Sequence, residues 1–236
     1  MRKALAGIAA LALVGSAAWF MAPRSADAQG GGTVEVEVKY NGPAQVETLK
    51  VNKDTEQCGK EAKIEKVAVG GNKGLANAVV SVPGAKGGAA KAVKGTVDQH
   101  GCKFVPHVTA MTPGELDLKN SDDILHNIHT YSTANPSINK AQPKFKKVMT
   151  EKFEKPEMIK LTCDVHSWML GWVAVLPNQF FGVTDANGVT KIDNVPPGKW
   201  NVKVWYRDGW LDLPPRSIDV PGREYRIDLT SEAFGK

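Results

Sequence analysis

The feature that most constrains the fold is the alternation of apolar and polar residues with a period of two along much of the chain. Residues 33–40 read TVEVEVKY, and 46–51, 64–69 and 75–82 repeat the pattern, with Val and Ile between breaks of Gly, Pro and Asn. This period places alternate side chains on opposite faces of an extended strand, whereas an amphipathic helix needs apolar residues three and four apart. We therefore expect strands in these segments and no long helix.

The same pattern predicts further strands in the middle of the chain. They cover residues 102–111, 115–119, 124–131, 158–163 and 171–176. Residues 83–95, which read PGAKGGAAKAVKG, have no periodic apolar face and are expected to form an exposed loop.

The last part of the chain restarts the strand pattern at Phe180. We expect a hairpin with its turn at Asn187-Gly188, because this dipeptide accepts the positive φ angles of a type I′ turn. The segment WNVKVWYR places Trp200, Val202, Val204 and Tyr206 on one face of a strand. The predicted architecture is all-β, a sandwich of about seven strands or more followed by a smaller β module after residue 178 or so.

The first 28 residues have the layout of an export signal. A positive start at residues 2–3 precedes an apolar run over 4–22, and residues 26–28 (Ala-Asp-Ala) form a small-x-small cleavage site. The alternative is an uncleaved anchor, because a run of this length can just span a bilayer. In both cases we expect the folded chain in the periplasm or another extracytoplasmic compartment, with cleavage near Ala28. No lipid anchor is expected, because no cysteine lies near that point.

Composition and charge exclude several classes of protein. Apolar residues make up 42% of the chain and charged residues 23%, which is close to ordinary globular usage. The net charge of +5 falls to +3 without the signal segment, because Arg2, Lys3 and Arg24 against Asp27 contribute +2 of it. A nucleic-acid binder is usually far more basic. We find no Ser/His/Asp set, phosphate-binding Gly loop or acid–base carboxylate pair, so we expect no enzymatic activity.

The strongest chemical signal is the segment MIKLTCDVHSWMLGWVAV, residues 158–175. Cys163, His166 and Met169 follow one another at three-residue steps, so a thiolate, an imidazole and a thioether share one loop between two predicted strands. His126 lies 37 residues before Cys163, at the start of another predicted strand. Two imidazoles and one thiolate in a plane, with a weak axial thioether, form a donor set that selects copper.

These motifs resemble the cupredoxins. The short C-x-x-H-x-x-M loop with an upstream H-N-x-H is similar to that of amicyanin, whereas plastocyanin has a longer spacing between His and Met. The resemblance covers residues 93–177 and implies a Greek-key β-sandwich that binds one copper per chain and carries single electrons between redox protein partners. It implies these ligands: His126, Cys163, His166 and Met169. The chain departs from the family pattern in a longer insertion after His129 and in its N-terminal extension.

The predicted domain order is sequential. Residues 1–28 are the signal peptide, 29–92 an N-terminal β extension, 93–177 the cupredoxin copper-binding domain and 178–236 a small C-terminal β-sandwich module. The segment FFGVTDANGVTKIDNVPPGKWNVKVWYR in the last unit is similar to a carboxypeptidase regulatory-like, or transthyretin-like, module, which has no catalysis of its own.

Several residues around the predicted ligands keep alternative interpretations. Asn127 is expected to donate a hydrogen bond that ties the two ligand-bearing loops together. His129 is a rival ligand only if the strand bends, since it lies three residues from His126. Cys58 and Cys102 are expected to form a disulfide in an oxidising compartment. The alternatives are two free thiols, or a second metal site that combines Cys102 with His100 and His107.

Two surfaces are candidates for contact with redox partners. The stretch NKAQPKFKK contains Lys144 and Lys146, which can steer an acidic protein partner, or can form a solvated loop. Trp168 and Leu170 follow the loop histidine and can form an apolar docking patch, or can pack in the core.

Three other functions remain open at this point. A copper carrier or storage protein would use the same ligands without electron traffic. A metal-free adhesion or carbohydrate-binding β-sandwich would make the Cys163 loop structural. A zinc site from one cysteine and two histidines is possible by ligand type, although the thioether favours copper.

Overall fold

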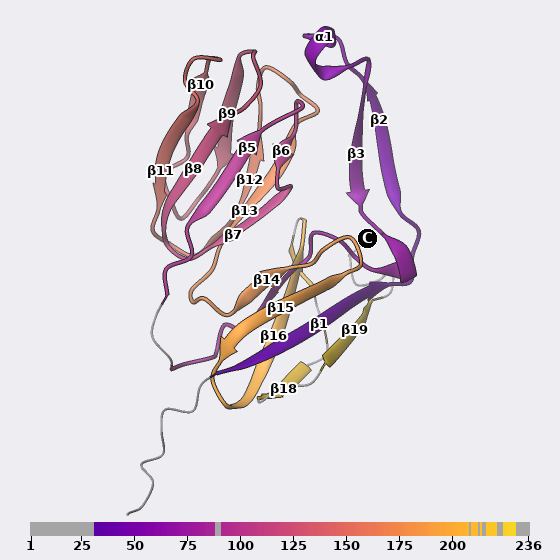
Figure 1. Ribbon diagram of the computed structural model, residues 1–236, viewed down its shortest axis with the longest axis vertical. Coiled ribbons are helices and arrows are strands. Elements are labelled where there is room, and N and C mark those ends of the chain that lie inside the picture. The colour runs from indigo at the N-terminus through magenta and orange to yellow at the C-terminus, as the bar shows by residue number, and fades with distance from the viewer. Residues whose placement is uncertain are drawn as a thin grey trace, which may run out of the picture.

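Two β-sandwiches and a hairpin make up the chain in the computed structural model, which describes residues 31–87, 91–207, 209–211, 213, 216–220 and 224–229 (Figure 1). The predicted signal peptide, residues 1–28, lies outside these residues. Among the helices that are described, none is long and apolar enough to cross a bilayer. The prediction of an all-β architecture built around a β-sandwich is confirmed.

The first sandwich, which we call the site sandwich, packs a five-stranded sheet against a four-stranded sheet. The five-stranded sheet has the order β10-β9-β12-β13-β7, with β7 (Val108–Met111), β9 (His126–Tyr131), β10 (Asn139–Gln142), β12 (Glu157–Thr162) and β13 (Leu170–Val175). The four-stranded sheet has the order β11-β8-β5-β6, with β5 (Gly95–Gln99), β6 (Phe104–Val105), β8 (Gly114–Asn120) and β11 (Val148–Phe153).

One apolar core joins the two sheets of the site sandwich. It includes Val97, Leu116 and Leu118 from the four-stranded sheet and Ile128, Ile159 and Leu161 from the five-stranded sheet, all at most 1% exposed. These residues alternate with exposed ones along their strands, as the period-two pattern requires. The core thereby holds the start of β9 and the end of β12 at the same end of the sandwich (Figure 1).

The second sandwich, which we call the terminal sandwich, is built from both ends of the described chain. In one sheet β1 (Gly32–Tyr40) lies between β15 (Val189–Val195) and β19 (Glu224–Leu229). The other sheet has the order β14-β4-β16-β17, and β18 also pairs with β16. Its strands are β4 (Val79–Ser81), β14 (Phe181–Val183), β16 (Gly198–Tyr206), β17 (Gly209–Trp210) and β18 (Arg216–Val220). The predicted apolar face of β16 is buried at Val202, Val204 and Tyr206.

This pairing corrects the predicted domain order. Residues 29–92 and 178–236 were expected to form separate units, but β1 and β4 pair with strands that follow residue 178. The apolar faces of β1 and β4 need a second layer to cover them, and the C-terminal strands supply it. Alternation within a strand does not reveal which distant strand will be its neighbour.

A hairpin of β2 (Gln45–Lys50) and β3 (Glu61–Val67) leaves the terminal sandwich and runs beside the site sandwich (Figure 1). The short helix α1 (Thr55–Cys58) forms its far end, and the 3-10 turn η1 (Gly71–Lys73) follows β3. Leu49, Ala62 and Ile64 pack against the core of the site sandwich. The hairpin therefore covers one side of that sandwich.

A smaller apolar cluster joins the two sandwiches. Trp172 on β13 and Trp205 on β16 meet edge to face, with ring centroids 5.1 Å apart and planes at 70°. Val79, Val108 and Leu176 are buried with them. The burial of Trp172 thus serves this contact between the sandwiches.

Several strands and one turn differ from the sequence prediction, and β18 and β19 are among the strands that were not expected. Strand β5 begins at Gly95, the end of the predicted loop, and β10 and β11 fall where no strand was expected. β10 and β11 are edge strands with few buried residues, so their apolar alternation is weak. At Asn187-Gly188 only Gly188 takes a positive φ, 78°, and β14 and β15 join different sheets. The turn is therefore not type I′, which needs two positive φ angles.

The insertion after β9 is organised around the carboxylate of Glu157 at the start of β12. This carboxylate accepts hydrogen bonds from Ser132, Thr133, Ala134 and Asn135. Although burial opposes the shift, these donors lower the pKa of Glu157 from 4.5 to about 2. These hydrogen bonds to the half-buried carboxylate organise the loop.

Replacing Glu157 tests this arrangement. We expect Glu157→Gln to lower the free energy of unfolding by about 1–2 kcal/mol at pH 7, because several N–H groups lose a charged acceptor. The folded pKa lies below the unfolded one, so the wild-type advantage is complete above pH 4.5 and disappears as the pH falls through about 2. Urea unfolding at pH 7 and at pH 3 measures both effects.

The neighbouring exposed Glu154 provides the matched control. We expect Glu154→Gln to change the free energy of unfolding by less than about 0.5 kcal/mol at either pH. A Glu157→Gln deficit of equal size at both pH values would contradict the assignment.

Candidate metal centre

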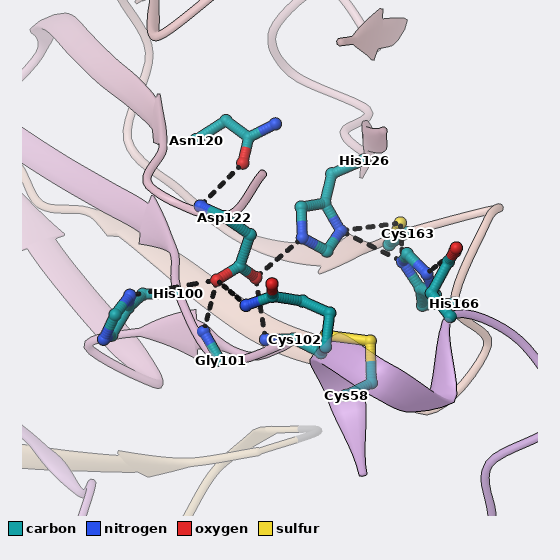
Figure 2. The surroundings of a disulfide bond; sticks show 11 residues. Cys58, His100, Gly101, Cys102, Asn120, Asp122, His126, Cys163 and His166 are labelled. Carbon is teal, nitrogen blue, oxygen red and sulfur yellow. Dashed lines mark hydrogen bonds and ion pairs between the residues drawn. A yellow bond between two sulfur atoms is a disulfide. The ribbon is translucent and has the colours of Figure 1, made fainter. Parts of the chain in front are cut away.

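His126, Cys163 and His166 converge at one end of the site sandwich (Figure 2). The Nδ1 atoms of the two histidines lie 3.0 Å apart, and the Cys163 Sγ lies 4.0 Å from His126 Nδ1 and 3.8 Å from His166 Nδ1. Both histidines are fully buried, and Cys163 is a free thiol with 2% exposure. One nitrogen from each ring and the sulfur therefore face a common point.

The strands explain this convergence. His126 is the first residue of β9, and Cys163 directly follows β12, which pairs antiparallel with β9. His166 lies in the short loop before β13, where its carbonyl accepts a hydrogen bond of 2.9 Å from the backbone N–H of Met169. Antiparallel pairing brings the start of one strand next to the end of its neighbour, so residues 37 apart in sequence become neighbours in space.

Asn127 ties the two ligand-bearing segments together, with its hydrogen-bond role reversed from the prediction. Its Oδ1 accepts a hydrogen bond of 2.9 Å from the backbone N–H of Asp164, where we expected its side chain to donate. Its Nδ2 donates to Asn139 on β10. This fixes the position of Cys163 relative to β9.

Burial and backbone N–H donors act in opposite directions on the Cys163 thiol. Burial raises its pKa, while the backbone N–H groups of Asn127, His166 and Val165 point toward the sulfur and oppose that shift. These donors stabilise a thiolate, and a bound cation would complete the removal of the proton.

A carboxylate holds the far side of each imidazole. The Oδ2 of Asp122 lies 2.9 Å from His126 Nε2, and the Oδ2 of Asp54 lies 2.9 Å from His166 Nε2. Each Nε2 then carries the proton, which leaves each Nδ1 with a lone pair toward the common point. Burial lowers the pKa of His126, more than its contact with Asp122 raises it, so this ring is neutral at neutral pH. Such outer carboxylates fix ligand orientation and increase ligand basicity.

Asp122 is itself held firmly, as Figure 2 shows. It accepts hydrogen bonds from the backbone N–H groups of Gly101 and Cys102, at 2.8 and 2.9 Å. Burial raises the pKa of this carboxyl, but the donors at Cys102, His126 and Gly101 together hold it below its usual range. Neither Asp122 nor Asp54 was predicted from the sequence as a partner of these histidines. Only Asp122 had a local signal, its position four residues before a predicted ligand.

Met169 lies in the same core cluster as Cys163 and is 2% exposed. Its place beside the histidine loop is compatible with an axial ligand, and this role stays a prediction.

The predicted disulfide between Cys58 and Cys102 is confirmed, with a Cα–Cα distance of 5.4 Å. It removes Cys102 from the possible ligands, so the alternative second site with His100 and His107 is wrong. His107 is half-buried, and its ring bonds the carbonyl of Leu170. His129 turns to the outer face of the sheet, where its Nδ1 bonds Asp164 at 2.9 Å. Neither histidine belongs to a ligand cluster within the described residues.

The two predicted docking surfaces differ in exposure. Trp168 is 6% exposed and Leu170 is half-buried, and both line a cleft of about 290 Å³ between β3 and the site sandwich. Of the two interpretations of Trp168, core packing is confirmed and an exposed docking residue is wrong, because the β2–β3 hairpin lies over it. Lys144 and Lys146 are exposed on either side of Phe145, which is 84% exposed.

Comparison with known proteins gave matches to solved structures alone. No family model matches the chain, and no curated protein matches it. Amicyanin from Paracoccus versutus (Thiobacillus versutus) is 18% identical over 41% of this chain and 96% of its own, with a TM-score of 0.30. The purple cupredoxin from Nitrosopumilus maritimus is 19% identical over 34% of this chain and 97% of its own, with a TM-score of 0.29.

The copper-containing nitrite reductase from Thermus scotoductus SA-01 is 22% identical over 39% of this chain, with a TM-score of 0.32. The chain spans a quarter of the length of that enzyme, 25%. The strand pairing defines the fold, and the distances between donor atoms define the site. Together they define an all-β sandwich protein with a buried cluster of two histidines and one cysteine.

The role of Asp122 is testable by truncation. We expect Asp122→Ala to lower the free energy of unfolding of the metal-free protein by about 2–4 kcal/mol, because the buried N–H of Cys102, the part-buried N–H of Gly101 and His126 Nε2 lose their acceptor. The neighbouring Asp123 has a side chain that is 85% exposed, so Asp123→Ala should cost less than about 0.5 kcal/mol. Urea unfolding of both variants measures the difference. Equal losses would show that Asp122 does not organise the site.

Proposed function

We propose that this chain is an exported, type-1-like mononuclear copper protein that carries single electrons between redox protein partners and has no enzymatic activity. The observation that carries the proposal is the buried cluster of His126, Cys163 and His166, whose donor atoms all lie within 4.8 Å of one another. Two imidazoles and one thiolate are the donor set of blue-copper sites, and the buried Met169 beside them supplies a candidate axial thioether. The same three donors also suit zinc. The preference for copper therefore depends on the thioether of Met169.

Copper would supply a reversible one-electron couple at this position. The residues of the chain supply rigidity. His126 and Cys163 are fixed by paired strands, Asn127 joins their segments, and a carboxylate holds each histidine. Ligands that do not move when charge changes keep the rearrangement on electron transfer small. This arrangement supports electron transfer more than a carrier function, because both histidines are fully buried and release of an ion would require the site to open.

The lysine loop between β10 and β11 is the docking surface that exposure favours. Lys144, Phe145 and Lys146 are exposed, and the next residue, Lys147, reaches back to the carbonyl of Asp122 at 3.3 Å. Asp122 bonds His126, so the loop lies close to a predicted ligand. Its positive charge fits an acidic protein partner and would speed association at low salt.

A copper titration of the purified protein tests the proposal. We expect one copper per chain with an intense visible thiolate-to-copper band, and a stabilisation of about 4 kcal/mol at 1,000 times the dissociation constant. Cys163→Ser should lose the band. A Lys144→Glu/Lys146→Glu variant should keep it while its association with an acidic redox partner slows.

Three results would overturn the proposal in different ways. Colourless copper binding would remove the electron-transfer function and favour a carrier or store. Stoichiometric zinc without copper would replace the metal. No metal at all, with unchanged stability in Cys163→Ser, would favour a metal-free adhesion or carbohydrate-binding β-sandwich.

A further inference from the structure

We propose that the β2–β3 hairpin, with α1 at its tip, is a cap over the metal centre, and that Asp54 on this cap is a positioning residue for His166. This inference rests on the proposed function for its metal, and it names a segment outside the predicted cupredoxin domain as part of the site. We call residues 45–67 the cap hairpin.

The contact between Asp54 and His166 is direct. Asp54 Oδ2 lies 2.9 Å from His166 Nε2, although the two residues are 112 positions apart. The His166 side chain is 0% exposed, while that of Asp54 is 32% exposed. The carboxylate therefore stands between the imidazole and solvent, and closes the edge of the ring that faces away from the metal point.

The backbone of the cap fixes the direction of this carboxylate. Asp54 has a left-handed conformation, φ 49° and ψ 41°, which aspartate and asparagine tolerate better than most residues. Its carbonyl accepts hydrogen bonds from the backbone N–H groups of Gln57 and Cys58, at 3.0 and 2.8 Å. The tight turn begins at Asp54 and leads directly into the disulfide.

Two further contacts hold the cap on the site sandwich. The Cys58–Cys102 disulfide ties the tip of the cap to the loop whose Cys102 N–H donates to Asp122. The apolar face of the hairpin, with Leu49 and Ile64, packs on the core that contains Cys163 and Met169. Through the disulfide, the cap is connected to the hydrogen bonds behind both histidines.

The chemical consequence follows from charge and access. A carboxylate on Nε2 makes His166 a stronger donor and adds negative charge that favours the more highly charged state of a metal at Nδ1. The cap also keeps water and chelators from the His166 edge. It should therefore slow loss of the metal and lower the reduction potential of the centre.

The test uses Asp54→Asn and Asp54→Gly in the full chain after export. Both residues accept the left-handed backbone, so the cap can keep its turn while the carboxylate is lost. Glu56→Gln, in the same turn and exposed, is the matched control. We expect both Asp54 variants to lose copper to a chelator about 10–100 times faster than wild type, with a higher reduction potential and a shifted visible band. Glu56→Gln should match wild type.

A second measurement does not depend on the metal. Diethylpyrocarbonate acylates an exposed imidazole nitrogen, and peptide mass spectrometry locates the adduct. In the metal-free protein we expect His166 to resist modification in wild type and in Glu56→Gln. It should react at least tenfold faster in Asp54→Gly and in the Cys58→Ser/Cys102→Ser double variant, which frees the cap.

The outcomes separate the two proposals. If wild type binds no copper but His166 is protected as described, the copper function fails and the cap stands. If His166 reacts equally in wild type and Asp54→Gly, the cap is wrong. If copper binds but Asp54→Asn matches Glu56→Gln in metal loss, potential and band position, the positioning role of Asp54 is wrong.

Discussion

The buried carboxylate of Asp122 is the constraint on which the candidate metal centre depends. It accepts the N–H groups of Gly101 and Cys102, bonds His126, and lies 3.4 Å from the amide of Gln57 on the cap hairpin. An ionised group with 1% side-chain exposure is stable only when its oxygens are satisfied. The carboxylate of Asp122 therefore holds four parts of the structure together. They are the loop before β6, the disulfide, the cap hairpin and His126.

The sequence allowed the strands and the inner donors to be predicted for clear physical reasons. Alternation with period two reports which side of a strand faces a core, and this was sufficient for β1, β8, β9, β12 and β13. His126 and Cys163 sit at strand ends, where antiparallel neighbours meet, and His166 lies in the short loop after Cys163, so their convergence was predictable from local pattern. Polar edge strands such as β10 carry no such pattern and were missed.

The parts that sequence did not reveal depend on distant pairing. Asp54 is one aspartate among many until the hairpin packs on the sandwich, and no spacing links it to a histidine 112 positions later. The division into sequential domains failed for the same reason, because β1 satisfies its hydrogen bonds with β15 and β19. Trp168 is a further example, because its sequence position allows an exposed docking residue. The β2–β3 hairpin buries it, and that packing is not visible in the sequence.

The pairing of β1 with β19 also has a consequence for folding during synthesis. Glu35 aligns with Glu224 in a parallel register, so the first described strand cannot complete its sheet until nearly the whole chain has been made. Strands β5 to β13 pair among themselves and are contiguous in sequence, so the site sandwich can assemble earlier. Before β19 has been made, β1 has an unpaired edge that other chains could join. A chain that stalls before β19 would keep His126, Cys163 and His166 in place and expose an unpaired strand edge.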